Sequence, residues 1–314
     1  MSLSHFFAPR TVAVIGASTD PTKLGYAVLN NLLQGGFLKE DRRVYPINPT
    51  AKSILGQPCF KSVLAVPGPI DLAVIVIPYP AVPDAVRECG EKAIPAAIVI
   101  SAGFREAGWE GAERERELLE VARQFSIRLI GPNCLGVIDT LTPLNATFSA
   151  GMPPSGPMAF MSQSGALGAA ILDWAMAGRL GLSKFVSLGN KADVSETDLL
   201  QEWAADPALR VILAYIEGLP DGQQFIRVAR EVSRQKPVVA IKSGITHAGA
   251  RAVTSHTGSL AGSEQAYQAA FRQAGVIRAD TLEELLDFAL AFGYLTPLRG
   301  DRVAIVTNAG GPGI

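Results

Sequence analysis

Short apolar runs alternate with helix-forming segments along almost the whole chain of 314 residues. Hydrophobic residues make up 48% of the chain but aromatic residues only 7%, so Val, Ile, Leu and Ala supply most of the apolar mass. Strands of these residues, each followed by a helix, are typical of parallel sheets that are covered on both faces. The sequence therefore predicts an α/β fold, and its length allows about two domains of ordinary size.

Residues 1–130 are predicted to form a doubly wound, Rossmann-like parallel domain, because strand and helix signals alternate regularly through them. The strand candidates are short, rich in Val and Ile, and bounded by turn residues: Thr11–Ile15, Arg43–Ile47, Asp71–Ile77, Ala96–Ile100 and Arg128–Ile130. The helix candidates between them are Tyr26–Gln34, Ala81–Lys92 and Glu110–Phe125.

The same alternation returns at residues 158–297 and predicts a second parallel α/β domain, of the flavodoxin-like type. Its strand candidates are Met158–Met161, Lys184–Ser187, Val211–Ile216 and Pro237–Lys242. Its helix candidates are Gly165–Ala177, Glu196–Ala205, Gln223–Arg234, Leu260–Ala274 and Leu282–Ala291. Residues 131–157 lie between the two domains, are rich in Pro, Gly and Thr, and are expected to be a connecting segment.

Residues 298–314 are expected to begin a third α/β domain. A strand candidate at Asp301–Thr307 runs into the glycine-rich sequence NAGGPGI, where the chain ends and where a helix should follow. We therefore expect the chain to be a piece of a longer protein.

Charge and cysteine content exclude several classes of function. The net charge is −1 and no basic run is present, which disfavours binding to nucleic acid or to an anionic membrane. The three cysteines are scattered singly, without metal-ligand or redox spacing, so we expect no metal site and a reducing cytoplasm. The first residues do not resemble a signal peptide, and no apolar run reaches the roughly 18 residues of a membrane helix.

A glycine loop follows the first strand candidate and is predicted to bind a nucleotide phosphate. Strand, glycine turn and helix N-terminus together direct backbone N–H groups toward an anion. The spacing from Gly16 to Gly25 does not match G-x-G-x-x-G, and the second strand ends at Asn48 without the carboxylate that an NAD site favours. A tight turn that binds nothing is the alternative.

Three further loops follow strand candidates at the same predicted edge of the first sheet. They are Pro78-Tyr79-Pro80, the segment Ser101–Phe104 and the segment Gly131–Cys134. Because ligands of open α/β sheets bind at the carboxyl edge of the strands, these loops favour a cofactor crevice there.

A serine turn begins the second domain. The strand candidate Met158–Met161 ends in Ser162-Gln163-Ser164-Gly165, and a helix candidate follows. Hydroxyl and N–H groups at a helix N-terminus bind phosphate well, although a plain helix cap has the same sequence.

Only three histidines are present, and two of them share one loop. His5 lies at the N-terminus, where an exposed bystander is expected. His247 and His256 lie in the segment Gly244–Gly262, which is rich in small and polar residues and follows a strand candidate. A neutral imidazole is a competent nucleophile toward phosphorus, so His256, between Ser255 and Thr257, is the candidate phosphoryl carrier. His247 is a minor alternative, as a residue that contacts solvent or an anion.

An attacking imidazole needs a carboxylate that orients it and stabilises its positive charge. Glu217 follows the strand candidate Val211–Ile216 and shares its sheet edge with the histidine loop, so it is the candidate for this role. An ordinary surface carboxylate is the alternative.

Taken together, these blocks resemble the α-subunit portion of the NDP-forming acyl-CoA synthetases, relatives of succinyl-CoA synthetase. The resemblance covers essentially the whole chain, and three blocks in this order are highly specific together. The matching blocks are VAVIGAS (12–18), YPINP (45–49), IVIP (75–78), ISAGF (100–104), GPNCLG (131–136), SQSGALG (162–168), YIEG (215–218), SHTGSLAG (255–262) and AIVTNAGGPG (304–313), of which GPNCLG, SQSG and SHTGSLAG are the specific three.

The resemblance implies a CoA-binding first domain and a second domain that carries a phosphohistidine. It implies that CoA is faced by Gly16, Ser18, Gly25, Asn48, Pro78, Ser101, Phe104 and Asn133. It also implies that Ser162, Ser164 and Gly165 hold phosphate, and that Glu217 steadies the phosphorylated His256.

The family's reversible reaction converts acyl-CoA, phosphate and ADP into carboxylate, CoA and ATP, through acyl phosphate and phosphohistidine. The resemblance implies an ATP-grasp domain or β subunit as partner, which would bring the nucleotide and Mg²⁺, and an αβ or higher assembly. Two alternatives stay open at this point. One is a regulatory module that senses acyl-CoA within a larger lysine acetyltransferase, and the other is an NAD-dependent oxidoreductase.

Overall fold

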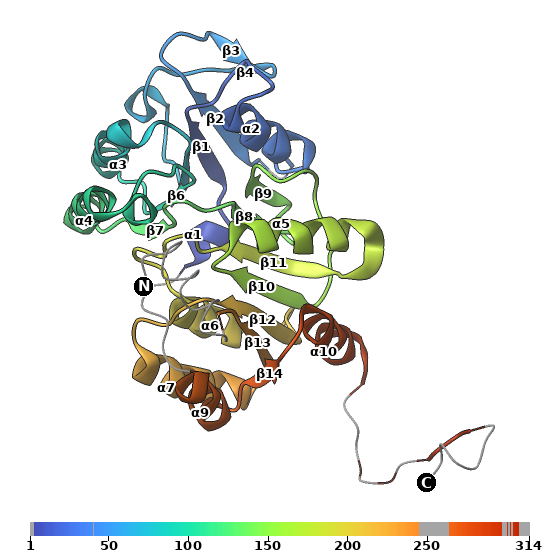
Figure 1. Ribbon diagram of the computed structural model, residues 1–314. Coiled ribbons are helices and arrows are strands. Elements are labelled where there is room, and N and C mark those ends of the chain that lie inside the picture. Colours follow the sequence, from blue (N-terminus) through green and yellow to red (C-terminus); the bar gives the residue numbers. More distant parts are fainter. Residues whose placement is uncertain are drawn as a thin grey trace.

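Two large sheets, the first parallel and the second mainly parallel, form the centre of the two halves of the computed structural model (Figure 1). It describes residues 3–39, 41–244, 264–296, 300, 302 and 304–307. The first domain, blue to green in Figure 1, lies above the second, which is coloured green to red. The predicted fold, two consecutive α/β domains, is confirmed, and each of its predicted parallel strands is present within two residues of the expected bounds.

The first sheet has five parallel strands in the order β2-β1-β5-β6-β7. Alternate residues of each strand face opposite layers, so that Val12 and Val14 pack under α2 while Ala13 and Ile15 pack under α3 and α4. The strand order reverses between β1 and β5, which is where open α/β sheets bind ligands. The elements are β1 (Thr11–Ile15), α2 (Leu24–Gln34), β2 (Arg43–Ile47), β5 (Leu72–Ile75), α3 (Val82–Glu91), β6 (Ala96–Val99), α4 (Trp109–Gln124) and β7 (Arg128–Ile130).

The second sheet has seven strands in the order β14-β13-β12-β10-β11-β8-β9. Its parallel part reverses between β10 and β12, and the helices divide between its two faces, α5 and α10 on one and α6, α7 and α9 on the other (Figure 1). The parallel strands are β10 (Met158–Ser162), β11 (Leu182–Ser187), β12 (Val211–Ile216), β13 (Val238–Lys242) and β14 (Ile277–Ala279). The helices are α5 (Gly165–Trp174), α6 (Glu196–Ala204), α7 (Gly222–Ser233), α9 (Glu264–Ala274) and α10 (Leu282–Tyr294).

The expectation that residues 131–157 are only a connecting segment is wrong. This segment forms β8 (Gly136–Asp139) and β9 (Leu144–Thr147), which extend the second sheet beyond β11 as two antiparallel strands. All residues of both strands are buried. Their apolar signal is short and interrupted by Gly, Asn and Thr, and pairing with β11, far along the chain, stabilises them.

Several short elements were also missing from the sequence prediction. They are the helix α1 (Ser4–Phe7), the hairpin strands β3 (Ser53–Ile54) and β4 (Gln57–Pro58), and β14. The predicted strand at Asp301–Thr307 is not formed at residues 304–307, which the structure describes, and Val306 is 97% exposed. Elements this short depend on a partner strand or a packing surface, which local sequence does not reveal.

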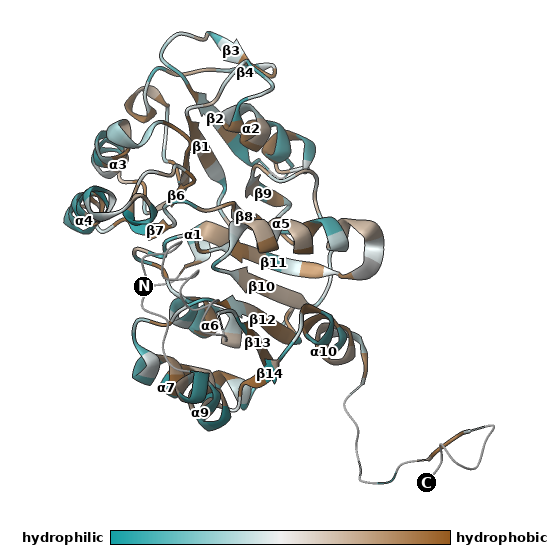
Figure 2. Ribbon diagram, in the orientation of Figure 1, coloured by the Kyte–Doolittle hydropathy of each residue, from teal (hydrophilic) through white to brown (hydrophobic). Residues whose placement is uncertain are grey.

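One continuous apolar core joins the two domains. The ring of Phe7, from α1, lies 6.0 Å from that of Trp203 in α6, and α2 packs against β9. The amide of Asn31 donates hydrogen bonds to the carbonyl oxygens of Thr147 (2.8 Å) and Ser149 (2.6 Å). Figure 2 shows apolar residues concentrated in the strands and polar residues on the outer helices. Among the described residues, no helix has the length and apolar character required to cross a bilayer.

Candidate functional site

A crevice of about 960 Å³ lies between the carboxyl ends of the two sheets. Such a volume is near the upper end of the range for small-molecule sites, roughly 300–1,000 Å³, and suits a large ligand. The loops at both strand-order reversals open into it, those after β1 and β5 from the first domain and those after β10 and β12 from the second. The predicted site residues that line it are Gly16, Ser18, Gly25, Asn48, Pro78, Ser101, Asn133, Ser164, Gly165 and Glu217.

The two glycines of the first loop are required by close main-chain contacts. Gly16 has a φ of +92°, and a Cβ atom there would lie 2.2 Å from the carbonyl oxygen of Val76. A Cβ atom at Gly25 would lie 1.9 Å from the carbonyl oxygen of Gly16. The spacing from Gly16 to Gly25 therefore brings the N-terminus of α2 against the β1 loop, so that helix N–H groups and loop both face the crevice.

Asn48 links the first loop to the turn after β2. Its amide N–H group donates to the carbonyl oxygen of Ala17 at 2.9 Å, while its Oδ1 accepts from the N–H groups of Thr50 (2.9 Å) and Ala51 (3.0 Å). An aspartate keeps the accepting half of this arrangement but lacks the donor. The position therefore selects an amide, which agrees with the absence of the acidic residue typical of NAD sites.

The loops after β5, β6 and β7 are tied to one another. The hydroxyl of Ser101 donates to the carbonyl oxygen of Ile77 at 2.6 Å, and the N–H group of Asn133 donates to the carbonyl oxygen of Ser101 at 2.9 Å. Phe104, which the family resemblance implies faces CoA, is not among the residues that line the crevice, contrary to expectation. Its ring is fully buried in the core beneath α3 and α4, because it anchors the loop to that core.

The serine turn begins α5. Ser164 caps this helix, since its Oγ accepts from the N–H group of Leu167 at 3.3 Å. Ser162 does not line the crevice, contrary to expectation. It is fully buried, and its hydroxyl donates to the carbonyl oxygen of Ser164 (2.7 Å) and accepts from the Ser164 N–H group (3.1 Å). Ser162 therefore shapes the turn, while Ser164, Gly165 and the N-terminus of α5 face the crevice.

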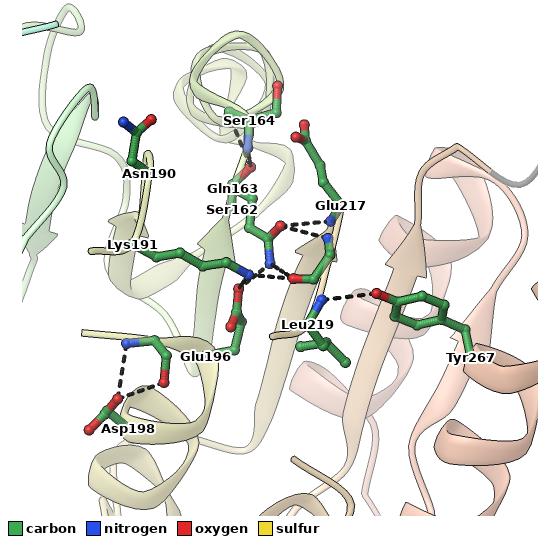
Figure 3. Close-up of polar contacts among 12 residues, drawn as sticks. Ser162, Gln163, Ser164, Asn190, Lys191, Glu196, Asp198, Glu217, Leu219 and Tyr267 are labelled. Atoms are coloured by element: carbon green, nitrogen blue, oxygen red, sulfur yellow. Dashed lines mark hydrogen bonds and ion pairs between the residues drawn. The ribbon is translucent and has the colours of Figure 1, made fainter. Parts of the chain in front are cut away.

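Glu217 directly follows β12 and lies on the second-domain side of the crevice, with 7% of its surface exposed. In Figure 3 its side chain extends to the level of Ser164, at the N-terminal end of α5. The other predicted catalytic residue, His256, and the alternative, His247, lie outside the described residues. The described part of the chain thus brings Ser164, Gly165 and Glu217 together at one wall.

Sequence reasoning missed a polar cluster that crosses from one domain to the other. Asn190, after β11, donates through its amide to Glu106 (2.6 Å) and to Glu115 (2.8 Å) of the first domain. Arg105 contacts the same cluster through the carbonyl oxygen of Asn190 and the carboxylate of Glu115. Asn190 and Lys191 follow the predicted strand Lys184–Ser187, so the rule that ligands bind after parallel strands would have pointed to them.

The pKa values of the two carboxylates in this cluster are shifted in opposite directions. Burial raises the pKa of Glu115, although hydrogen bonding from Asn190 and the charge of Arg105 act against it. Burial also acts on Glu106, but hydrogen bonds from Asn190 and from the N–H groups of Gly103 and Phe104 outweigh it and lower the pKa. The Asn190 amide therefore stabilises the charged form of both carboxylates at the domain boundary, because it donates a hydrogen bond to each.

Comparison with known families divides the chain as the structure does. Residues 10–140 match the family described as a CoA binding domain. Residues 155–292 match the family described as a succinyl-CoA ligase like flavodoxin domain.

The chain is similar along its whole length to ADP-forming ligases. It is 51% identical to acetate–CoA ligase (ADP-forming) I of Archaeoglobus fulgidus, and the match covers 99% of the chain but only 44% of that relative. It is 48% identical to the α subunit of acetate–CoA ligase (ADP-forming) II of Pyrococcus furiosus, covering 99% of the chain and 67% of the subunit.

A solved structure is also similar. The dinucleotide forming acetyl-coenzyme A synthetase 1 of Ca. Korarchaeum cryptofilum, in complex with phosphate and ADP, superimposes with a TM-score of 0.95 at 43% identity. The match covers 99% of the chain and 67% of that protein.

Proposed function

The chain belongs to the ADP-forming acyl-CoA synthetase family, and from this premise we propose that it is the CoA-binding, phosphohistidine-carrying part of such an enzyme. The observation that carries the proposal is that the carboxyl edges of both sheets open into one shared crevice. The wall formed by the first domain suits a nucleotide-like ligand such as CoA. On the wall formed by the second domain, the N-terminus of α5 and Glu217 both face the crevice. A thioester held on the first wall would therefore meet phosphate held on the second.

The proposed reaction has three steps. A phosphate oxygen attacks the acyl carbonyl carbon of acyl-CoA, the C–S bond breaks, and CoA leaves as a thiolate that takes up a proton. A ring nitrogen of His256 then attacks the phosphorus of the acyl phosphate, and the carboxylate leaves. Finally a terminal oxygen of ADP attacks the phosphohistidine, the P–N bond breaks, and ATP forms.

The described residues supply positioning and electrostatic stabilisation for the first two steps. The N–H groups at the start of α5, with the hydroxyl of Ser164, stabilise the negative charge of phosphate and of the transferring group. Glu217 lies beside them, where its carboxylate would stabilise the positive charge of the phosphorylated imidazole.

We propose that the third step needs a partner that binds the nucleotide and Mg²⁺. The similarity covers 44% of one relative's length and 67% of an α subunit's length, and the partner would be an ATP-grasp domain or β subunit. We further propose an αβ or larger assembly in the cytoplasm. The relatives named above are ligases, which supports catalysis and not the regulatory alternative.

Phosphate transfer tests the proposal. The chain, together with its ATP-grasp partner, is incubated with acetyl-CoA and labelled phosphate, or with labelled ATP and Mg²⁺. We expect acid-labile, base-stable label to appear on the chain with either source of label. We expect no such label on the His256→Ala variant. Label that persists on His256→Ala would contradict the assignment of the carrier.

Ligand binding is tested separately by thermal shift. We expect CoA to raise the melting temperature of the chain, by an amount equivalent to about 2.7 kcal/mol at a hundredfold excess over Kd. NAD at the same concentration is the control and should leave the melting temperature unchanged. Stabilisation by NAD and not by CoA would refute the proposal.

A further inference from the structure

The side-chain amide of Gln163 holds the main chain of the turn that carries Glu217 (Figure 3). Its Oε1 accepts hydrogen bonds from the N–H groups of Glu217 and Gly218, both at 2.9 Å. Its Nε2 donates to the carbonyl oxygen of Gly218 at 2.9 Å and to the carboxylate of Glu196. We call these contacts between Gln163, Glu217 and Gly218 the Gln163 clamp.

The clamp and the contact with Glu196 together use the full hydrogen-bonding capacity of the amide, which is two donors and an oxygen with two lone pairs. Two main-chain N–H groups face the amide oxygen and two acceptor oxygens face the amide nitrogen. A flipped amide would place donor against donor and acceptor against acceptor, so only one orientation fits. Because its polar atoms are all engaged within the protein, Gln163 has none left for substrate although it lines the crevice. Its role is therefore to position other groups.

A buried ion pair between Lys191 and Glu196 supports the clamp. Lys191 donates to Glu196 at 2.8 Å and to the carbonyl oxygen of Gly218, so it shares both of the acceptors that Gln163 uses. The Glu196 side chain is 1% exposed and that of Lys191 is 7% exposed. A charge-assisted contact at this depth is stronger than one at the surface. The pair thereby fixes the two acceptors and with them the Gln163 amide.

The clamp also ties the two halves of the proposed phosphate-transfer wall together. The N–H group of Gln163 donates to the carbonyl oxygen of Tyr215 at 3.2 Å, so residue 163 is joined to the end of β12 through both main chain and side chain. Its neighbour Ser164 caps α5. The next N–H group of the turn, that of Leu219, donates to the hydroxyl of Tyr267 at 2.9 Å. The N–H groups of residues 217–219 are thus all held by side chains from other elements.

We infer that Gln163 is a positioning residue, which fixes Glu217 relative to the N-terminus of α5, and that Lys191 and Glu196 maintain it. The inference rests on the proposed function, because the positioned carboxylate acts on the phosphorylated histidine. The clamp contacts only the main chain of this turn. It therefore acts on the Glu217 carboxylate indirectly, by fixing the backbone from which that side chain extends. A displacement of about 1 Å at such a group costs roughly 100-fold in rate.

A double-mutant cycle tests this in the full enzyme with its ATP-grasp partner. Gln163→Leu, Glu217→Asp and the double variant are compared with the unchanged protein in the rate of phosphohistidine formation from acetyl-CoA and labelled phosphate. We expect Gln163→Leu to lower kcat about 100-fold with the KM for acetyl-CoA unchanged. In the Glu217→Asp background the same change should cost less than about fivefold, since the geometry that it maintains is already lost. Gln201→Leu, at an exposed position of α6, is the matched control and should retain full activity.

A second variant guards against simple misfolding of Gln163→Leu. Lys191→Met keeps the Gln163 amide but removes the cation beneath it, and should lower kcat about tenfold with CoA binding retained. Equal losses from Gln163→Leu in both backgrounds, or unchanged kcat in both Gln163→Leu and Lys191→Met, would overturn the inference. Failure of the proposed function looks different, because the unchanged protein then forms no phosphohistidine at all.

Discussion

Across the boundary between the two domains, the side-chain amide of Asn190 donates a hydrogen bond of 2.8 Å to the carboxylate of Glu115. Its second donor serves Glu106 at 2.6 Å. The main chain around Asn190 is also paired with the loop that follows β7, since its N–H group donates to the carbonyl oxygen of Pro132 at 2.8 Å. One residue of the second domain thus donates to two neighbouring carboxylates of the first, which joins the two domains at the wall of the crevice.

Asn190→Asp replaces that amide by a third carboxylate of the same shape. We expect the free energy of unfolding at pH 7 to fall by about 3 kcal/mol, because a buried charge cluster loses its donor. The loss should shrink as the pH falls toward 4. The crowded carboxylates of the folded variant have raised pKa values and take up protons that the unfolded chain does not yet bind, so its stability rises.

In the unchanged protein the lowered pKa of Glu106 works in the opposite direction. Its contribution to stability is present above the ordinary pKa of a glutamate and is lost as the pH falls through the lowered value. Denaturant unfolding of both proteins between pH 4 and pH 8 measures the difference. Gln201→Glu adds the same charge at an exposed position of α6 and should show almost no loss. A loss for Asn190→Asp that is the same at every pH would exclude the electrostatic explanation.

Gly25→Ala tests the close approach of α2 to the first loop. The added methyl group would lie 1.9 Å from the carbonyl oxygen of Gly16, so helix or loop must move. We expect a destabilisation of about 1–3 kcal/mol and weaker CoA binding, measured by denaturant unfolding and by calorimetry. Gly222→Ala, at the open first turn of α7, is the matched control and should be neutral in both. Unchanged CoA affinity in Gly25→Ala would show that the close contact between Gly25 and Gly16 is not needed for CoA binding.

Asn48→Asp removes the side-chain donor that holds the first loop, and it changes little else. The acceptor contacts to Thr50 and Ala51 are retained, whereas the hydrogen bond to the carbonyl oxygen of Ala17 is replaced by repulsion between two oxygens. We expect the Kd for CoA to rise about tenfold, equivalent to about 1.4 kcal/mol. Calorimetric titration with CoA measures the effect. Equal affinity in the variant would show that this loop does not contact the ligand.

Ser164→Ala distinguishes capping from phosphate stabilisation. The change removes the cap of α5 and should cost about 1 kcal/mol of stability. Thr281→Ala removes the corresponding cap of α10, where Thr281 accepts from the N–H group of Glu284 at 3.1 Å, and should cost a similar amount. Only Ser164→Ala should slow phosphohistidine formation, by about tenfold or more, because only Ser164 lines the crevice. Equal rates in the two variants would leave Ser164 with the capping role alone.

Much of the fold could be predicted because its signals are local. Val- and Ile-rich runs such as Thr11–Ile15 and Val211–Ile216 form strands with the predicted bounds. Apart from Ser162, the predicted glycine, asparagine and serine positions of the loops come together at one crevice, since parallel strands all end at the same edge of a sheet. The same rule also covers Asn190 and Lys191, which follow β11.

The amino-acid sequence by itself determined the order of strands and helices, the two domains and the positions after each strand where a ligand would be held. Tertiary structure decided which of those positions face the crevice. Phe104 turned into the core and Ser162 into its own turn, while residues 136–147 joined the second sheet as edge strands. It also decided the clamp of Gln163 on Glu217 and the contact of Asn190 with Glu115. These contacts join residues more than fifty positions apart. The first forms only when β10 and β12 pair within the second sheet, and the second forms only when the two domains pack together, so no local pattern encodes either.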